Sequence, residues 1–274
     1  MKLRRKIYSD MIKLSVMMSI AVIVFGSCQR VIHVDLNTAN SQVVIQAYVT
    51  DQPNIDTVLI TKTGSYFTPG GYAGINGATV IVTDNMGTTD TFMQVDSGKY
   101  AAMHLTGIPG RTYTMKVIVY GKEYDAVSTM PMAVNIDSLL CNVVGSGSDT
   151  SYHVHVYFAD PASTTDFYMA QGYINGTLQD SAGNITLDRD KYTNGMEQNL
   201  RLRIPNPFPH DSVRVNLLTI DANIYNYFTV LRSVTRGSNP VSTATPQNPP
   251  TNILGGALGY FSAHTLRTKS IVMP

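Results

Sequence analysis

Two histidines on one predicted strand are the first candidates for metal chemistry. His153 and His155 alternate with apolar residues, so both imidazoles would share one face of a strand over residues 152–158. Two imidazoles at this spacing could begin a zinc site, which needs further ligands. The remaining histidines show no spacing that supplies them: His33, His104, His210 and His264. The pattern is more typical of a polar strand face, and no metal is expected there.

An acidic stretch carries the oxygen ligands that calcium prefers. Its members are Asp188, Asp190, Asn194 and Glu197. An EF-hand loop repeats acidic or amide ligands at alternate positions, and Tyr192 stands at one of them. A solvated loop explains this stretch better than a calcium site.

Hydrolytic chemistry has little support. The sequence has no G-x-S-x-G nucleophile motif, and Ser146 lies in a Gly/Ser run without an evident histidine partner. Asp160 and Asp166 could form a carboxylate pair, but Asp160 precedes Pro161 and is typical of a turn. We therefore expect no enzyme activity and no cofactor.

The surroundings of Cys28 predict a covalent modification. A basic N-terminus precedes an apolar run of 12 residues, 14–25, and the run ends in Phe25-Gly26-Ser27-Cys28. This order resembles the signal peptide and lipobox of a bacterial lipoprotein. The resemblance implies cleavage before Cys28 and acylation of that residue with chains such as palmitate. The alternative is a transmembrane anchor, but a spanning helix needs about 20 apolar residues.

Composition excludes one class of partner. Without residues 1–27 the chain keeps 15 basic and 18 acidic residues, a formal charge of −3, so no nucleic-acid partner is expected.

If Cys28 is acylated, Cys141 has no partner for a disulfide, and its apolar neighbours predict a buried, unreactive thiol.

Alternating β-branched residues dominate the sequence after a tether over residues 28–42. Seven short runs between Val43 and Thr129 are separated by hairpin-length turns, which predicts an N-terminal antiparallel β-sandwich over 43–132. A second β-rich region is expected over 133–274. One helix is predicted near 221–236, with Asp221 as its cap and an apolar face that runs from Ile224 to Val234. A last strand is predicted over 269–273. The expected class is mostly β, with two Ig-like or transthyretin-like sandwich regions.

Two loops are candidates for contact with a partner or ligand. The Gly-rich loop 64–72 carries Tyr66, Phe67 and Tyr72, and aromatic side chains on loops supply contact area. The alternative is that these rings fold back onto their own sandwich. The loop 237–256 is rich in Pro and polar residues, and a loop of this length is usually functional.

Three stretches carry a resemblance to a known family. They are Val43-Val44-Ile45-Gln46-Ala47-Tyr48-Val49-Thr50 after the lipobox; Gly77-Ala78-Thr79-Val80 with Gly98-Lys99-Tyr100 and Gly110-Arg111-Thr112-Tyr113; and Pro249-Pro250-Thr251-Asn252-Ile253 with Gly255-Gly256-Ala257-Leu258-Gly259-Tyr260-Phe261. Together they resemble the outer-membrane lipoproteins of Bacteroidota grouped as domain of unknown function 4249. These motifs are turn and packing positions, so they identify a fold better than a chemistry.

The resemblance implies a setting at the cell envelope. We expect a non-catalytic lipoprotein of the outer membrane, held by its lipid anchor, that is an accessory or ligand-binding partner of a TonB-dependent transporter barrel in nutrient uptake. Display at the cell surface is favoured over the periplasmic face. The alternatives are a structural or adhesive surface protein and, with least support, an envelope hydrolase.

Overall fold

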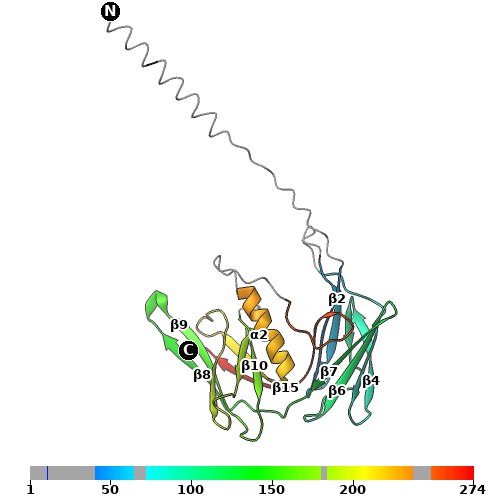
Figure 1. Ribbon diagram of the computed structural model, residues 1–274. Helices are drawn as coiled ribbons and strands as arrows, with labels where there is room; N and C mark the ends of the chain where they lie inside the picture. The colour runs from blue at the N-terminus through cyan, green and yellow to red at the C-terminus, as the bar shows by residue number, and fades with distance from the viewer. Residues whose placement is uncertain (1–10, 12–40, 65–71, 180–183, 237–247) are drawn as a thin grey trace, which may run out of the picture. The chain divides into compact units, whose positions relative to one another are not determined.

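The computed structural model describes residue 11 and residues 41–64, 72–179, 184–236 and 248–274 (Figure 1). Residues 40–274 form one compact unit. The predicted signal peptide over residues 1–27 and nearly all of the tether over 28–42 lie outside the described residues. Strands make up 51% of the described residues and helix 9%, which confirms the predicted mostly-β class.

The first region has the predicted run of antiparallel hairpins. Its strands in the described part of the chain are β1 (Val43–Thr50), β2 (Thr57–Lys62), β3 (Thr79–Asp84), β4 (Thr89–Asp96), β5 (Lys99–Ala101), β6 (Thr112–Val119) and β7 (Lys122–Thr129). Buried and exposed positions alternate along β6, as the period of 2 predicts. The predicted turns join β3 to β4, β4 to β5 and β6 to β7, and Gly87, Gly98 and Gly121 adopt positive φ in them.

The second region adds two groups of strands and the helix. Its elements are β8 (Ser138–Val144), the 3₁₀ helix η1 (Gly147–Asp149), β9 (Ser151–Ala159), β10 (Phe167–Ile174), β11 (Thr177–Leu178), β12 (Thr186–Arg189), β13 (Glu197–Arg201), β14 (Ser212–Ile220), α2 (Ala222–Arg236) and β15 (Leu258–Val272). Strands β13, β9 and β8 form a three-stranded sheet. The others join the larger sheet.

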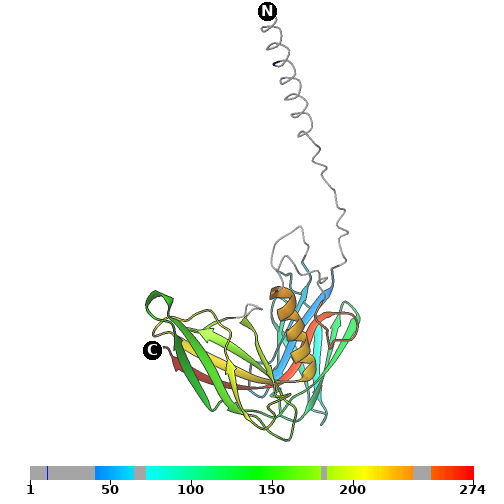
Figure 2. The ribbon, with the colours of Figure 1, turned by 60° about the vertical axis from the view of Figure 1, so that its left-hand side comes forward.

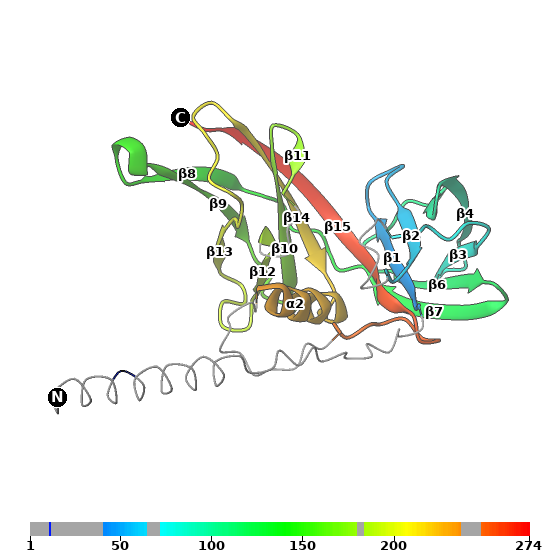
Figure 3. The same cartoon turned by 90° about the horizontal axis from the view of Figure 1, so that it is seen from above.

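Strand β15 unites the two regions in one sheet. Its first half pairs in parallel with β1, from Val44 opposite Leu258 to Thr50 opposite His264. Its second half pairs antiparallel with β14. The strand order is β11-β10-β14-β15-β1-β2-β5-β4-β3-β6-β7, and Figure 3 shows β15 between β14 and β1. The predicted last strand, 269–273, was therefore too short, because the stretch after residue 257 extends along β1.

The cores lie on the inner faces of these strands. The first core combines side chains of β1 to β7 with Phe261 and Ala263 of β15. The second lies between the three-stranded sheet and strands β10 and β14, with Phe158 against Tyr168 at a ring-centroid distance of 4.7 Å. The C-terminal segment thus contributes to the core of the predicted 43–132 sandwich as well as to its own region.

Helix α2 packs on the opposite face of the sheet from the second core (Figure 2). Asp221 caps it as predicted, because its Oδ1 accepts the backbone N–H groups of Asn223 and Ile224 at 2.8 and 3.0 Å. Ile224 is buried against Leu218 and Ile220 of β14. The predicted apolar face is confirmed at the start of the helix, whereas Val234 is exposed.

Candidate functional site

A hollow lies on the face of the large sheet that faces away from both strand cores. Its volume is about 270 Å³, and four neighbouring strands, β10, β14, β15 and β1, form its floor. Phe228 of α2, Leu178 of β11 and the loop residue Ile55 close its sides. The lining residues are Tyr48, Thr50, Ile55, Met169, Gln171, Tyr173, Leu178, Asn216, Leu218, Phe228, Tyr260, Ser262, His264 and Leu266.

Strand register places these side chains on one face. Residues directly opposite each other in a sheet point the same way, and successive residues point in opposite ways. Tyr48 lies opposite Ser262, while their neighbours Ala47 and Phe261 enter the first core. Gln171 lies opposite Asn216 in the same manner, with Ala170 and Leu217 in the second core. The hollow therefore exists only because β15 pairs with both β1 and β14.

Several polar groups in the hollow have no partner among the described residues. Within the described part of the chain, the hydroxyls of Tyr48 and Tyr260 and the amide of Gln171 form no hydrogen bond. Gln171 and Tyr48 are half-buried. Burial raises the pKa of Tyr260, so its hydroxyl stays protonated and can donate. Aromatic walls with a few unpaired polar groups are typical of sites that bind a ligand.

The wall near Tyr173 carries a cation. The guanidinium of Arg214 lies 4.0 Å from the centre of the Tyr173 ring, and the Tyr173 hydroxyl accepts from the Asn216 amide at 3.4 Å. Asn216 also accepts from Thr268 at 2.9 Å. These contacts hold Tyr173 and Asn216 in place, which prepares this side of the hollow for a ligand.

Ser262 and His264 form a buried pair on the floor of the hollow. Ser262 Oγ lies 2.9 Å from His264 Nδ1, and the His264 ring lies 5.9 Å from the Tyr48 ring. A serine beside a histidine can be a nucleophile with its base, but a third group must orient the histidine. The nearby Asp51 is already engaged by Leu266 N–H and the Arg267 guanidinium. Among the described residues, no carboxylate forms a hydrogen bond with His264 that would orient its ring.

The Ser262–His264 pair could not be predicted from the histidine spacing, because His264 shows no regular spacing to the other histidines. The one signal available was Tyr260, Ser262 and His264 at alternate positions, which places three polar or aromatic side chains on one strand face. That signal was hidden because the predicted strand began only at residue 269.

Acidification should destabilise the fold through His264. Burial lowers its pKa from 6.5 to about 4, and this outweighs Asp51, which acts in the opposite direction. The unfolded chain therefore takes up a proton below about pH 6.5, while the folded chain does not until about pH 4. Stability contributed by the neutral ring is full above pH 6.5 and is lost as pH falls from 6.5 to 4. Between pH 7 and 5 we expect a loss of about 2 kcal/mol.

The measurement is urea unfolding at pH 7 and pH 5 for the native chain and for His264→Gln. The variant should lose about 2 kcal/mol less than the native chain over this interval. Comparing the pH dependence of the two chains cancels the contributions of other groups to the free energy of unfolding. One such group is Asp56, because burial raises its pKa to about 7. Equal pH dependence in both chains would contradict the assignment.

A second hollow lies beside the predicted aromatic contact loop. Its volume is about 660 Å³, and it is lined by Val44, Gln46, Leu59, Thr61, Thr63, Gly64, Tyr72, Gly74 and Ser97. Tyr72 is 73% exposed. Tyr66 and Phe67 lie outside the described residues, as does most of the Pro-rich loop 237–256. Gln46 and Tyr48 lie two residues apart on β1, so both hollows open on the same sheet face.

The two histidines of β9, where no metal is expected, bond to neighbouring side chains. His153 Nε2 lies 2.8 Å from the Arg201 guanidinium, and His155 Nδ1 lies 2.7 Å from the Asn199 amide oxygen. Both partners belong to β13, the next strand of the small sheet. Ser146 lies in the turn before η1 and forms no side-chain cap. Cys141 is only half-buried, and burial raises the pKa of its thiol.

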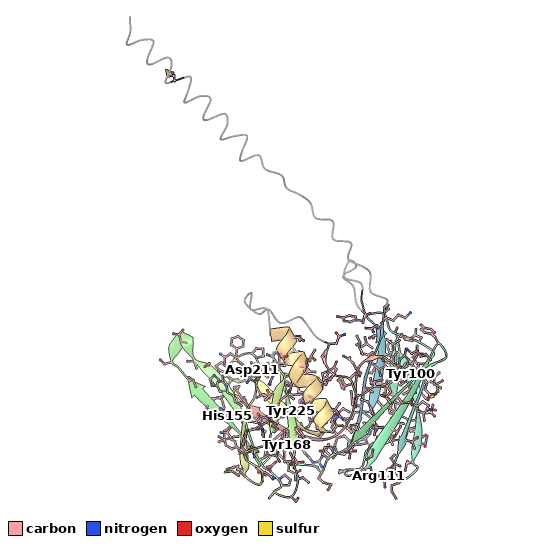
Figure 4. All side chains as sticks on the ribbon, in the orientation of Figure 1. Tyr100, Arg111, His155, Tyr168, Asp211 and Tyr225 are labelled. Atoms are coloured by element: carbon pink, nitrogen blue, oxygen red, sulfur yellow. The ribbon has the colours of Figure 1, made fainter. Side chains whose placement is uncertain are left out.

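Three carboxylates that sequence analysis considered separately lie together. Ligand oxygens of Asp160, Asp166 and Asp190 are within 4.8 Å of one another, and all three residues are buried. Of the acidic stretch over residues 188–197, Asp190 alone belongs to this cluster in the described part of the chain. Asp160 lies directly after β9, in agreement with its predicted turn chemistry, but its carboxylate is buried and accepts from the Tyr168 hydroxyl (Tyr168 is labelled in Figure 4).

Comparisons with known proteins identify a family but no activity. A family model described as a domain of unknown function (DUF4249) matches residues 29–270. No curated protein matches the chain. Among solved structures, the adhesin InvE of Yersinia pseudotuberculosis is 17% identical with a TM-score of 0.21; the match covers 65% of this chain and 55% of the adhesin chain. The chain thus spans little more than half of that structure. No helix among the described residues is long and apolar enough to cross a membrane.

Proposed function

We propose that this chain, which belongs to the DUF4249 family, is a non-catalytic binding lipoprotein of the outer membrane and an accessory partner of a TonB-dependent transporter. A lipid anchor on Cys28 would hold it at the membrane, with display at the cell surface favoured. The observation that carries the binding role is the hollow over β10, β14, β15 and β1, with its unpaired polar groups.

The chemistry of the hollow favours binding over catalysis. Its size suits a small polar molecule or the side chains of one short peptide segment rather than a large substrate. The amide of Gln171 and the hydroxyl of Tyr48 have no protein partner among the described residues, so both are available to a ligand with matching donors and acceptors. The Ser262–His264 pair has no orienting group and supports no hydrolytic step.

The sequence supports the membrane and transporter parts of the proposal. The lipobox before Cys28 predicts the anchor, and the family resemblance predicts the setting beside a transporter. The two hollows on one sheet face, the second lined by the exposed Tyr72, offer a surface on which a ligand and a barrel could be held together.

The test is co-purification of an outer-membrane barrel with the tagged full chain from detergent-solubilised membranes of its own cells. The double variant Tyr48→Phe, Gln171→Leu removes two unpaired polar groups at almost constant side-chain volume, so the fold should be retained. Losing two hydrogen bonds to the ligand or partner at about 1 kcal/mol each should lower barrel recovery by about tenfold or more.

A matched control is Gln42→Leu with Tyr120→Phe, because both residues are exposed and lie outside the hollow. The control should recover the barrel as the native chain does. Recovery of no barrel with the native chain would contradict the transporter partnership. Full recovery with the hollow variant would exclude the hollow from that partnership.

A further inference from the structure

The carboxylate cluster lies where the ends of the two sheets meet. Asp160 follows β9 of the small sheet, Asp166 precedes β10 of the large sheet, and Asp190 follows β12, which pairs with β10. Backbone bonds tie the loops together: Asp160 N–H donates to Met196 O at 3.2 Å, and Asp190 N–H donates to Asp166 O at 3.4 Å. Three chain segments therefore bring one carboxylate each to the same place.

Burial makes this cluster costly without a compensating charge. Asp160, Asp166 and Asp190 are 6%, 7% and 1% exposed. The charged groups that act on Asp166 are the other two aspartates, and together with burial they raise its pKa. The ion pairs of the described chain that involve acids lie elsewhere, at Asp84, Glu123 and Asp51. Like charges this close repel strongly where water is excluded.

Hydrogen bonds satisfy most of the oxygens but leave one without a partner. Asp160 accepts from the Tyr168 hydroxyl and, at 2.8 Å, from Gly195 N–H. Asp190 Oδ2 accepts Asp166 N–H at 2.9 Å. Asp190 Oδ1 is buried and has no hydrogen-bond partner among the described residues. A cation held between the three carboxylates would give this oxygen a partner.

We propose that Asp160, Asp166 and Asp190 bind a calcium ion that joins the ends of the two sheets. Calcium takes six to eight oxygen ligands at about 2.4 Å, so no two of its ligands are more than about 4.8 Å apart, and the oxygens of this cluster lie within that limit. Magnesium needs distances of about 2.1 Å and a tighter set of ligands. Zinc favours histidine and cysteine, and the cluster contains neither.

Asp56 is a buried carboxylate outside the cluster, and it shows how a lone carboxyl differs from three that lie together. Asp56 Oδ2 also lacks a hydrogen-bond partner, but among the described residues no group of potential metal ligands includes Asp56. Burial raises the pKa of Asp56 to about 7, so a lone carboxyl can be neutral there. Where three carboxylates lie together with an oxygen that has no partner, a divalent cation can neutralise their charge and bind that oxygen.

The first measurement uses the unmodified chain. Terbium replaces calcium in oxygen sites and luminesces when a nearby tyrosine is excited, and the Tyr168 hydroxyl donates directly to Asp160. We expect tyrosine-sensitised terbium luminescence that calcium displaces. Calcium at about 10 mM, compared with EDTA, should raise the melting temperature by about 3–10 °C, if the dissociation constant is about 10⁻⁴–10⁻³ M. No terbium signal and no melting shift would overturn the proposal.

Variants of the cluster test which residues cause the calcium-induced rise in melting temperature. Asp190→Asn and Asp166→Asn each remove one ligand charge at constant size, and both should abolish the calcium-induced melting shift. Glu197→Gln is the matched control, because Glu197 is an exposed acid on β13 close in sequence to the cluster; it should keep the full shift. A shift retained in both asparagine variants would place the ion elsewhere and overturn the assignment. If either variant fails to fold, terbium binding to the native chain still decides whether the proposal stands.

Discussion

Replacing Gly259 by alanine should destabilise the fold by about 4 kcal/mol, the largest effect that we expect from any single methyl group. Gly259 lies opposite Ile45 in the parallel pairing of β15 with β1, at φ +101°. A Cβ atom there would lie 1.9 Å from the carbonyl oxygen of Ile45, so one backbone must move. Backbone strain and overpacking each cost about 1–3 kcal/mol. Urea unfolding measures the sum of these two costs as a fall in the free energy of unfolding.

Gly256→Ala separates the two contributions. Gly256 also has positive φ, at +84°, but the nearest atom to its added Cβ is the Lys122 ammonium nitrogen at 3.9 Å. Its substitution should therefore cost only the strain, about 1 kcal/mol. Equal costs for the two variants would mean that close packing of β15 on β1 is not what Gly259 provides. Because Tyr260 follows Gly259 and lines the hollow, Gly259→Ala should also reduce binding there.

Local signals in the sequence were enough to predict the hairpins and the helix. The period of 2 along β3 and β6 and the glycines in their turns are contained within a few residues of each element. Asp221 similarly predicts the start of α2, because a cap accepts backbone N–H groups within the next three residues. Val234 was misassigned to the apolar face because nothing in the sequence shows where the sheet beneath the helix ends.

The parallel pairing of β15 with β1 could not be predicted in this way. Its partners are more than 200 residues apart in sequence, and neither strand alone specifies the other. The run from Gly255 to Gly259 is typical of a turn, yet part of it belongs to a strand whose close neighbour requires glycine. The hollow depends on this pairing, so its polar residues could not be grouped before the strand order was known.

The carboxylate cluster also could not be predicted from single segments of the sequence. The sequence assigned Asp160 to a turn and Asp190 to a solvated loop, and each assignment considered one segment at a time. The second was wrong for Asp190, which is buried. What makes them a site is that β10 pairs with β12 while β9 pairs with β13. Sequence spacing detects metal ligands that lie on one loop or helix, as in an EF-hand, and fails when each ligand comes from a different strand end.

Cys28→Ser should release the protein from the membrane. The lipobox predicts that acyl chains on Cys28 are the attachment, and a hydroxyl in place of the thiol cannot receive the same thioether-linked lipid. One acyl chain alone gives an association constant of about 10⁴ M⁻¹, and several chains together hold a protein stably. We expect the variant to move from the detergent phase to the aqueous phase, or to accumulate as an uncleaved precursor without incorporated palmitate.

Cys141→Ser is the matched control, because it changes the other cysteine of the sequence by the same single atom. Cys141 lies half-buried on β8, and the raised pKa of its thiol keeps it protonated. This variant should stay in the detergent phase and incorporate palmitate as the native chain does. If Cys28→Ser also stays there, as an uncleaved chain without palmitate, the apolar run before residue 28 holds the chain in the bilayer. The transmembrane alternative would then replace the lipid anchor, and with it the proposed mode of display.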